Sequence, residues 1–415
     1  MSDVRPFAAL RPTAEFAAKV AALPYDVMSS DEARKMAEGN PYCFLHVTKA
    51  EIDLDPSVDH YAPIVYETAA KNLAKLESDG VLVRDPKPCY YIYSQTMNGR
   101  TQTGVAAGSS VDEYLDGRIK KHELTREEKE QDRIRHVATT NANTGPVFMT
   151  HKPCPAITAF IKNWTAKHEP EYSFTPDDGI THTVWVVDCD DAINELRTLF
   201  AGLDALYIAD GHHRNASTAK VALRKRAENP GYCPDAPFNY YLSVLFSSDE
   251  LMIMDYNRVV KNLNGLSEEA YLEAVKKNFE VTPATAPGPV KPAARHSFGM
   301  YLNKTWYNLT AKPGLIDESD PVECLDYSIL QKHLLAPVLG ISDPRTHPDI
   351  DFVGGLRGVQ ALADHVDKDG GVAFSMYPAS MEELIAIADA GQIMPPKSTW
   401  FEPKLRSGLF VHTLG

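Results

Sequence analysis

Five consecutive residues, Asp210 to Arg214, carry the most conspicuous chemistry in the sequence. They read Asp-Gly-His-His-Arg and follow the apolar run Ala205–Ala209, which predicts a buried strand. Residues 215–223 have helical composition, so a glycine turn should join this strand to the start of a helix. Such a turn directs backbone N–H groups and the positive end of a helix dipole at one point, which suits a phosphate. The two imidazoles add donors, and a guanidinium can hold a phosphate through two parallel hydrogen bonds.

The same residues permit two other interpretations. The turn could be purely structural, with solvated or capping histidines, but this combination after a buried strand favours a functional site. His212 and His213 could also be metal ligands. However, the side chains of adjacent residues diverge, and the Arg214 charge would oppose a cation. We therefore expect no metal ligands here and assign Gly211, His212, His213 and Arg214 to binding of phosphate or nucleotide.

Two further segments could contribute to a site. Lys121-His122-Glu123 precedes a charged helix expected from about Thr125, whose spacing to Glu128 suggests a capping box, so its polar groups lie at an element boundary. Near the C-terminus, prolines stiffen a loop. This loop carries Lys397, Ser398, Thr399 and Lys404. Ammonium and hydroxyl donors could hold a phosphate or a carboxylate, or the segment could be a wrapped tail. The sequence leaves these two interpretations open.

The composition narrows the class of protein. The 415 residues suffice for two or three domains, and 44% apolar with 24% charged residues is ordinary for a globular protein. A net charge of −14 argues against sequence-independent binding of nucleic acid, which requires a basic surface. No apolar run is long enough to span a membrane, and the N-terminus lacks the apolar core of a signal peptide. We therefore expect a cytoplasmic protein.

The hydrophobic pattern predicts both helices and strands. Tyr61–Asp79 reads as an amphipathic helix, and Asn98-Gly99 reads as the turn of a hairpin between two strands. Cys43–Val47 is strand-like. The six cysteines form no close pair that would suggest a zinc or redox motif. These patterns indicate an α/β (α+β) protein with mixed sheets and flanking helices.

The chain resembles the domain-of-unknown-function family numbered 1015 over nearly its whole length. The matching pieces are Arg5-Pro6-Phe7, Pro24-Tyr25-Asp26-Val27, Lys121-His122-Glu123 with Asp132-Arg133, Ala209 to Arg214, and Met394 to Thr399 with Pro403-Lys404. The core is also distantly similar to the fold shared by partition protein B, sulfiredoxin and the free L-serine kinases. This resemblance implies a nucleotide-binding core over residues 1–235 and an α+β region over residues 236–415, whose tail could return to the site.

The resemblance to the serine kinases implies an activity. These kinases carry Asp-Gly-His-His-Arg, matched here by Asp210 to Arg214, and use a glutamate of an upstream His-Glu segment as base, matched here by Glu123. We therefore expect phosphoryl transfer to a small hydroxyl metabolite, free L-serine, from ATP, ADP or pyrophosphate. Glu123, Asp210 and His122 are the expected catalytic residues, and Mg²⁺ is the expected cofactor.

Two other functions remain open, and the expected partners follow from the activity. The same turn could serve a nucleotide-dependent regulator without kinase activity, or a phosphatase acting on a phosphorylated metabolite. The expected partners are a small substrate and a phosphate donor, without nucleic acid or membrane, and the chain could form a homodimer.

Overall fold

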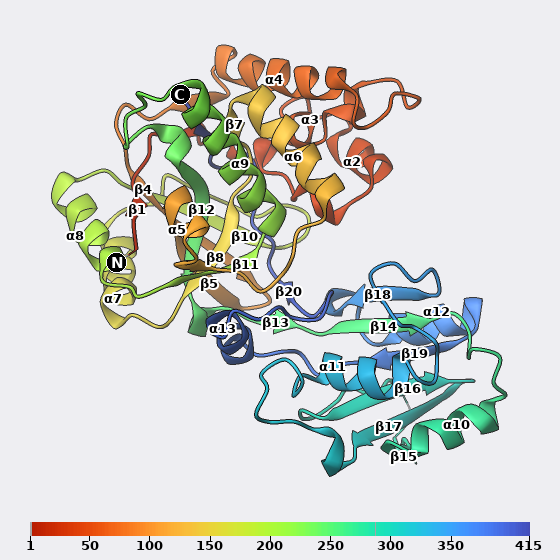
Figure 1. Cartoon of the computed structure of the whole chain (residues 1–415). Coiled ribbons are helices and arrows are strands. Elements are labelled where there is room, and N and C mark those ends of the chain that lie inside the picture. Colours follow the sequence, from red (N-terminus) through yellow and green to blue (C-terminus); the bar gives the residue numbers. More distant parts are fainter. Residues whose placement is uncertain (1, 287) are drawn as a thin grey trace. The chain divides into compact units, whose positions relative to one another are not determined.

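The computed structural model describes residues 2–286 and 288–415, which fold into two compact units. Unit 1 comprises Met1–Leu251 and Pro403–Gly415, and unit 2 comprises Met252–Glu402 (Figure 1). The division expected from the sequence lay at residue 235. The chain instead stays in unit 1 through strand β12 (Tyr240–Ser247), because β12 pairs with two strands of that unit, β5 (Arg100–Ser110) and β8 (Val147–His151).

Unit 1 is built on a mixed sheet of nine strands. Besides β5, β8 and β12, these are β1 (Val4–Arg5), β4 (Tyr90–Met97), β6 (Ile119–Lys120), β9 (Tyr172–Phe174), β10 (Thr181–Val187) and β11 (Leu206–Asp210). The order is β6-β11-β8-β12-β5-β4-β10-β9, with β1 also paired to β5. The β6–β11 and β8–β12 pairs are parallel, and the other pairs are antiparallel. The sheet is therefore mixed, as the sequence predicted.

The predicted hairpin forms the centre of this sheet. Asn98 and Gly99 join β4 to β5 with φ angles of 52° and 78°, the left-handed conformation that a tight hairpin turn requires. Apolar side chains of the strands pack in one buried cluster with those of four helices, α5 (Val111–Leu115), α7 (Pro155–Lys167), α8 (Asp190–Ala201) and α9 (His212–Glu228). This core fixes β11 and α9, which flank the glycine turn.

A second buried cluster lies among other helices of unit 1. Its helices are α1 (Ala17–Val20), α2 (Ser30–Ala37), α3 (Leu45–Thr48) and α4 (Pro63–Ser78). Helix α6 (Glu127–Thr140) instead packs Ile134 and Val137 against Val221 of α9 in a smaller cluster. The amphipathic helix predicted over residues 61–79 is confirmed as α4. The strand predicted over residues 43–47 is wrong, because this segment begins α3 and buries Phe44, Leu45 and Val47 in the helical cluster. So short an apolar run does not distinguish a helix from a strand.

The end of the chain is part of unit 1. Three short strands, β2 (Leu10–Pro12), β3 (Leu82–Arg84) and β7 (Ala142–Asn143), lie outside the main sheet, and β21 (His412–Thr413) pairs with β7. Leu409, Phe410 and Val411 are at most 1% exposed. Residues 403–415 therefore contribute to the core of unit 1, and the wrapped-tail interpretation describes this part of the C-terminal segment.

Unit 2 contains an antiparallel sheet of six strands in the order β15-β17-β16-β19-β14-β18. The strands of this sheet are β14 (Tyr256–Val260), β15 (Phe279–Pro283), β16 (Ser297–Leu302), β17 (Thr305–Ala311), β18 (Ile350–Gly354) and β19 (Val372–Ser375). Two further strands of unit 2, β13 (Ile253–Met254) and β20 (Trp400–Phe401), form a separate pair. The helices are α10 (Glu268–Lys276), α11 (Asp326–Leu330), α12 (Gln360–Asp369) and α13 (Met381–Asp389). Leu362, Ala363 and Val366 of α12 pack against the sheet.

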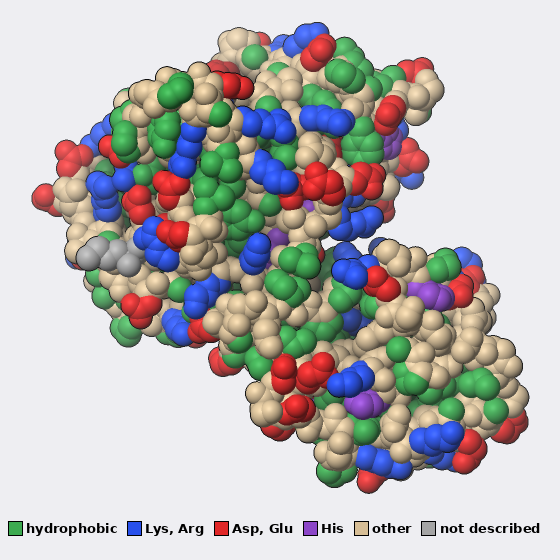
Figure 2. Space-filling model, in the orientation of Figure 1, with side chains coloured by type: hydrophobic (Ala, Val, Ile, Leu, Met, Phe, Trp, Pro, Cys, Tyr) green, Lys and Arg blue, Asp and Glu red, His purple; other side chains and the backbone are tan. Residues whose placement is uncertain are grey.

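The surface carries charges of both signs (Figure 2), and the length and apolar character of the helices determine whether any could cross a membrane. Lys and Arg side chains and Asp and Glu side chains are both spread over the visible face of each unit (Figure 2). No helix among the described residues is both long and apolar enough to cross a membrane.

Candidate functional site

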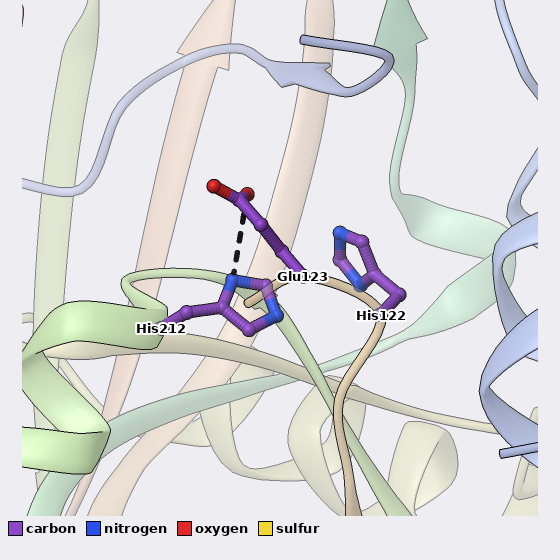
Figure 3. Close-up of side chains that lie close together, drawn as sticks. All are labelled: His122, Glu123 and His212. Atoms are coloured by element: carbon purple, nitrogen blue, oxygen red, sulfur yellow. Dashed lines mark ion pairs between the residues drawn. The ribbon is translucent and has the colours of Figure 1, made fainter. Parts of the chain in front are cut away.

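Two neighbouring parallel strands bring the distant polar segments together. β6 runs parallel to β11, with Ile119 opposite Leu206 and Lys120 opposite Tyr207. Because the carboxyl ends of parallel strands emerge at the same edge of a sheet, the residues after β6 and after β11 leave the sheet side by side. As a result, Oε2 of Glu123 lies 3.8 Å from Nδ1 of His212 (Figure 3). The His-Glu segment and the Asp-Gly-His-His-Arg turn therefore form one cluster.

Gly211 makes the sharp turn between β11 and α9. Its φ of 91° is in the left-handed region, where residues with a Cβ are strained. A Cβ would also lie 3.4 Å from Cζ and Nε of Arg214 and 3.5 Å from Cα of Val147. The helix starts directly at His212, so the first-turn N–H groups have no acceptor within the helix and can bind a ligand.

Replacing Gly211 with alanine should therefore destabilise unit 1 by about 1–3 kcal/mol, the usual cost of a non-glycine residue held in this conformation. Urea denaturation followed by circular dichroism measures the change. Gly231→Ala is the matched control. The φ of Gly231 is not positive, and the atom closest to an added Cβ there would be 4.0 Å away. Equal stability of the two variants would contradict the role given to the turn.

Asp210 is held as a carboxylate at the end of β11. Oδ1 accepts a hydrogen bond from the Gly211 N–H at 2.7 Å, and Oδ2 accepts one from Nζ of Lys404 at 2.9 Å. Burial by itself would raise the pKa of Asp210, but the charges of Lys404 and Arg214 outweigh it and keep this pKa well below its usual value. Of the predicted C-terminal loop, Lys404 is thus the residue that reaches the turn.

Removing this ammonium should lower the stability of unit 1. We expect Lys404→Met to reduce the free energy of unfolding by about 1–2 kcal/mol, less than a fully buried charged hydrogen bond provides, because the Asp210 side chain is 32% exposed. The stability that the Asp210 carboxylate gains from Lys404 is fully present above the pKa of Asp210 in the unfolded chain, about 3.9. It is lost as the pH falls through the lower pKa of Asp210 in the folded chain. The difference from wild type, measured by denaturation, should therefore shrink in acid. Lys75→Met, which breaks the exposed pair with Asp79, should change stability far less, because solvent screens a surface ion pair. An equal effect of both substitutions at neutral pH would contradict this account of Lys404.

His122 and His212 are buried neighbours with 2% and 5% exposure. Their rings lie edge to face, with centroids 4.6 Å apart and planes at 89°. Burial lowers the pKa of His122 to about 4, although the Asp210 charge opposes this, and burial together with the His122 ring lowers the pKa of His212 well below its usual value. Within the described part of the chain, Nε2 of His212 has no hydrogen-bond partner, and the ring of His122 has at most a weak contact with the Ile208 backbone, which opposes the lowering of the His122 pKa. Both imidazoles are thus neutral near pH 7 and can accept hydrogen bonds or ligate.

Arg214 faces a polar cavity beside the turn. One Nη donates to the Pro146 carbonyl, and the other donates to Oδ2 of Asp26 at 3.3 Å, while Nε has no partner among the described residues. The cavity is lined by Tyr25, Thr48, Arg133, His136, Val137, Asn143, Thr144, Gly145, Arg214, Ser217, Thr218 and Ser407. Arg133 stacks its guanidinium on Tyr25, 4.0 Å from the ring centroid. The guanidinium groups of Arg214 and Arg133 give the cavity the charged donors that a phosphate requires.

His213 points elsewhere. Its Nε2 accepts a hydrogen bond from the Arg126 N–H at 3.0 Å, just before α6. The capping box expected at Thr125 and Glu128 does not form, because α6 begins at Glu127 and the Thr125 hydroxyl donates to Glu130. The two adjacent histidines therefore diverge, as the sequence indicated, and they have separate environments.

Lys397, Ser398 and Thr399 belong to unit 2. The Ser398 hydroxyl donates to the Pro395 carbonyl at 2.6 Å, and Nζ of Lys397 lies 5.8 Å from the centroid of the Tyr256 ring. The C-terminal segment that the sequence suggested as one phosphate-binding loop thus crosses from unit 2 into unit 1 before Lys404.

Several residues that line the cavity, and Asp26 which pairs with Arg214, were not assigned a role from the sequence. Asp26 and Arg133 belong to motif pieces that the sequence singled out, Pro24-Tyr25-Asp26 and Asp132-Arg133, but single polar residues in turns and charged helices usually have no ligand. Ser217 and Thr218 lie on the second turn of α9, and both hydroxyls donate to the Arg214 carbonyl. Their position one turn after the glycine was the available signal.

Comparison with known proteins identifies a family and gives distant structural likenesses. A family model described as a protein of unknown function (DUF1015) matches residues 4–328. No curated protein matches the chain. Among solved structures, a free serine kinase in complex with AMP has 16% identity and a TM-score of 0.36, covering 74% of this chain and 91% of its own. A conserved hypothetical protein from Pyrococcus furiosus has 14% identity and a TM-score of 0.35, covering 74% and 94%. SbnI from Staphylococcus aureus, truncated at its C-terminus, has 11% identity and a TM-score of 0.36, covering 72% and 82%. These low scores leave the function to be argued from the residues of the site.

Proposed function

We propose that this chain, which belongs to the DUF1015 family, transfers a phosphoryl group to a small hydroxyl metabolite, with free L-serine as the acceptor. The observation that supports this most is the position of Glu123 beside the Asp-Gly-His-His-Arg turn, with its carboxylate 3.8 Å from His212. A module that only binds phosphate needs no carboxylate there, whereas transfer to a hydroxyl requires a group that accepts the proton.

Each part of the site has a role in this proposal. The N–H groups at the start of α9 and the Arg214 guanidinium bind the phosphates, and Gly211 allows the phosphates to approach the backbone closely. Glu123, half exposed, takes the proton of the acceptor hydroxyl. His122 and His212, neutral and buried, pack beside this carboxylate, and Asp210 orients the acceptor amine.

Mg²⁺ fits the site only together with a donor. It prefers oxygen ligands and retains several waters, and the carboxylates at the site other than the base Glu123 are those of Asp210 and Asp26. Lys404 neutralises the charge of Asp210, and Arg214 neutralises that of Asp26. The phosphates would therefore supply most of the ligands, and the ion would neutralise charge that develops during transfer.

The cavity favours one other function. Its two guanidinium groups could hold a nucleotide without any transfer, as in a regulator. The discriminating experiment incubates the full-length protein with L-serine, Mg²⁺ and either ATP, ADP or pyrophosphate, and identifies products by ³¹P NMR. Phosphoserine supports the kinase, while nucleotide binding without phosphoserine from any donor supports the regulator.

A further inference from the structure

We propose that His122, Glu123 and His212 bind one divalent transition-metal ion, of which Zn²⁺ is the best match. One potential ligand atom from each of these side chains lies within 4.8 Å of the other two (Figure 3). This goes beyond the proposed phosphoryl transfer, because Mg²⁺ carried by a phosphate donor uses oxygen ligands and needs no imidazole. Two histidines and one glutamate are a ligand set that Zn²⁺ accepts, with a fourth position left for water or a substrate atom.

The buried histidines support this proposal through their unsatisfied nitrogens. Among the residues that the structure describes, Nε2 of His212 is unsatisfied, and the two ring nitrogens of His122 have no well-formed hydrogen bond beyond a weak contact with the Ile208 backbone. A buried polar atom without a partner destabilises the fold, so such atoms normally indicate a missing ligand or water.

The three ligand atoms would have to move only slightly closer together to bind one ion, since they already lie within 4.8 Å of one another. Ligand atoms on tetrahedral zinc are about 3.4 Å apart, as bonds of about 2.0–2.1 Å require. Glu123 can make most of the adjustment, because its side chain is 50% exposed while the His212 side chain is 4% exposed. The charges near the cluster are mixed: Lys121 opposes a cation near His212, and Asp210 favours one near His122.

His213 is not part of this set. The sequence argument against a metal concerned His212 and His213, whose side chains do diverge, and the Nε2 of His213 is bonded to the Arg126 N–H. The second imidazole is instead provided by His122, from the segment that follows β6. The pairing of β6 with β11 therefore creates a ligand set that adjacent histidines could not.

One consequence rests on the proposed function. If Glu123 is the base for the acceptor hydroxyl, a metal ion that ligates its carboxylate should inhibit phosphoserine formation. Metal binding itself does not depend on this consequence, so it can be tested without any substrate.

The test is a Co²⁺ titration of the full-length protein after treatment with a chelator, followed by visible absorption. Co²⁺ in a tetrahedral site absorbs strongly, and Zn²⁺ should displace it. We expect one Co²⁺ per chain, and more than about 100-fold weaker binding in His122→Ala, His212→Ala and Glu123→Gln, beyond the 10–100-fold typical of residues outside the ligand shell. His213→Ala is the matched control and should bind as wild type does.

Circular dichroism establishes that each variant is folded, and His122→Gln provides a second variant that keeps a polar side chain. The proposal is overturned if the wild type gives no tetrahedral spectrum, or if folded ligand variants bind Co²⁺ as tightly as the wild type. Because no serine or phosphate donor is present, absence of kinase activity would not produce either result.

Discussion

Replacing Glu123 with glutamine should lower the rate of phosphoserine formation by about 10²–10⁴-fold, the usual cost of losing a general base. Glutamine keeps the shape of the side chain but cannot accept the hydroxyl proton. Affinity for the phosphate donor should remain nearly unchanged, because the helix N-terminus and Arg214 bind the phosphates. Steady-state kinetics give the turnover number, and calorimetry gives the donor affinity.

Glu128→Gln is the matched control for this variant. Glu128 is exposed on α6, so its substitution removes the same charge only five positions along the chain and should leave turnover as in the wild type. If Glu123→Gln turns over at the wild-type rate, Glu123 is not the base, and Asp210 or His122 must take that role.

Replacing Arg214 with lysine should weaken donor binding by about 10–100-fold and lower the rate as well. Lysine keeps a positive charge but loses the planar guanidinium that binds two phosphate oxygens at once. The loss of one charged hydrogen bond, about 1.5–3 kcal/mol, corresponds to this range of affinity. Calorimetric titration with each donor measures the change.

Arg224→Lys provides the comparison, since Arg224 is exposed on the same helix and should not affect the donor. The two active-site variants should differ in kind: Glu123→Gln impairs mainly turnover, and Arg214→Lys impairs binding too. Wild-type donor affinity in Arg214→Lys would place the phosphates elsewhere.

The strongest local patterns in the sequence were sufficient to predict the elements that carry the turn. The buried run before Asp210, the glycine after it and the helical composition that follows correspond to β11, Gly211 and α9. The Asn-Gly hairpin and the helix α4 were equally clear, because each has a distinct periodicity or turn residue. The prediction of a strand at residues 43–47 failed, because a short apolar run fits either a helix or a strand. Packing in the helical cluster makes this segment part of α3.

The assembly of the site depended on long-range pairing that the sequence does not display. β6 has only two residues, too few for a periodic pattern, yet its pairing with β11 sets Glu123 and His122 beside His212. Likewise, nothing in the composition of residues 394–405 marks the point at which the chain leaves unit 2. The sequence therefore could not predict that Lys404 bonds to Asp210 in unit 1 while Lys397 lies in unit 2.

The most direct test of the central claim is a crystal structure of the protein with a non-hydrolysable phosphate donor and L-serine. We expect the donor phosphates at the first-turn N–H groups of α9 and at Arg214, and the serine hydroxyl about 2.6–3.2 Å from the Glu123 carboxylate. A donor bound away from Gly211 and Arg214, or a serine hydroxyl that does not reach Glu123, would contradict the account.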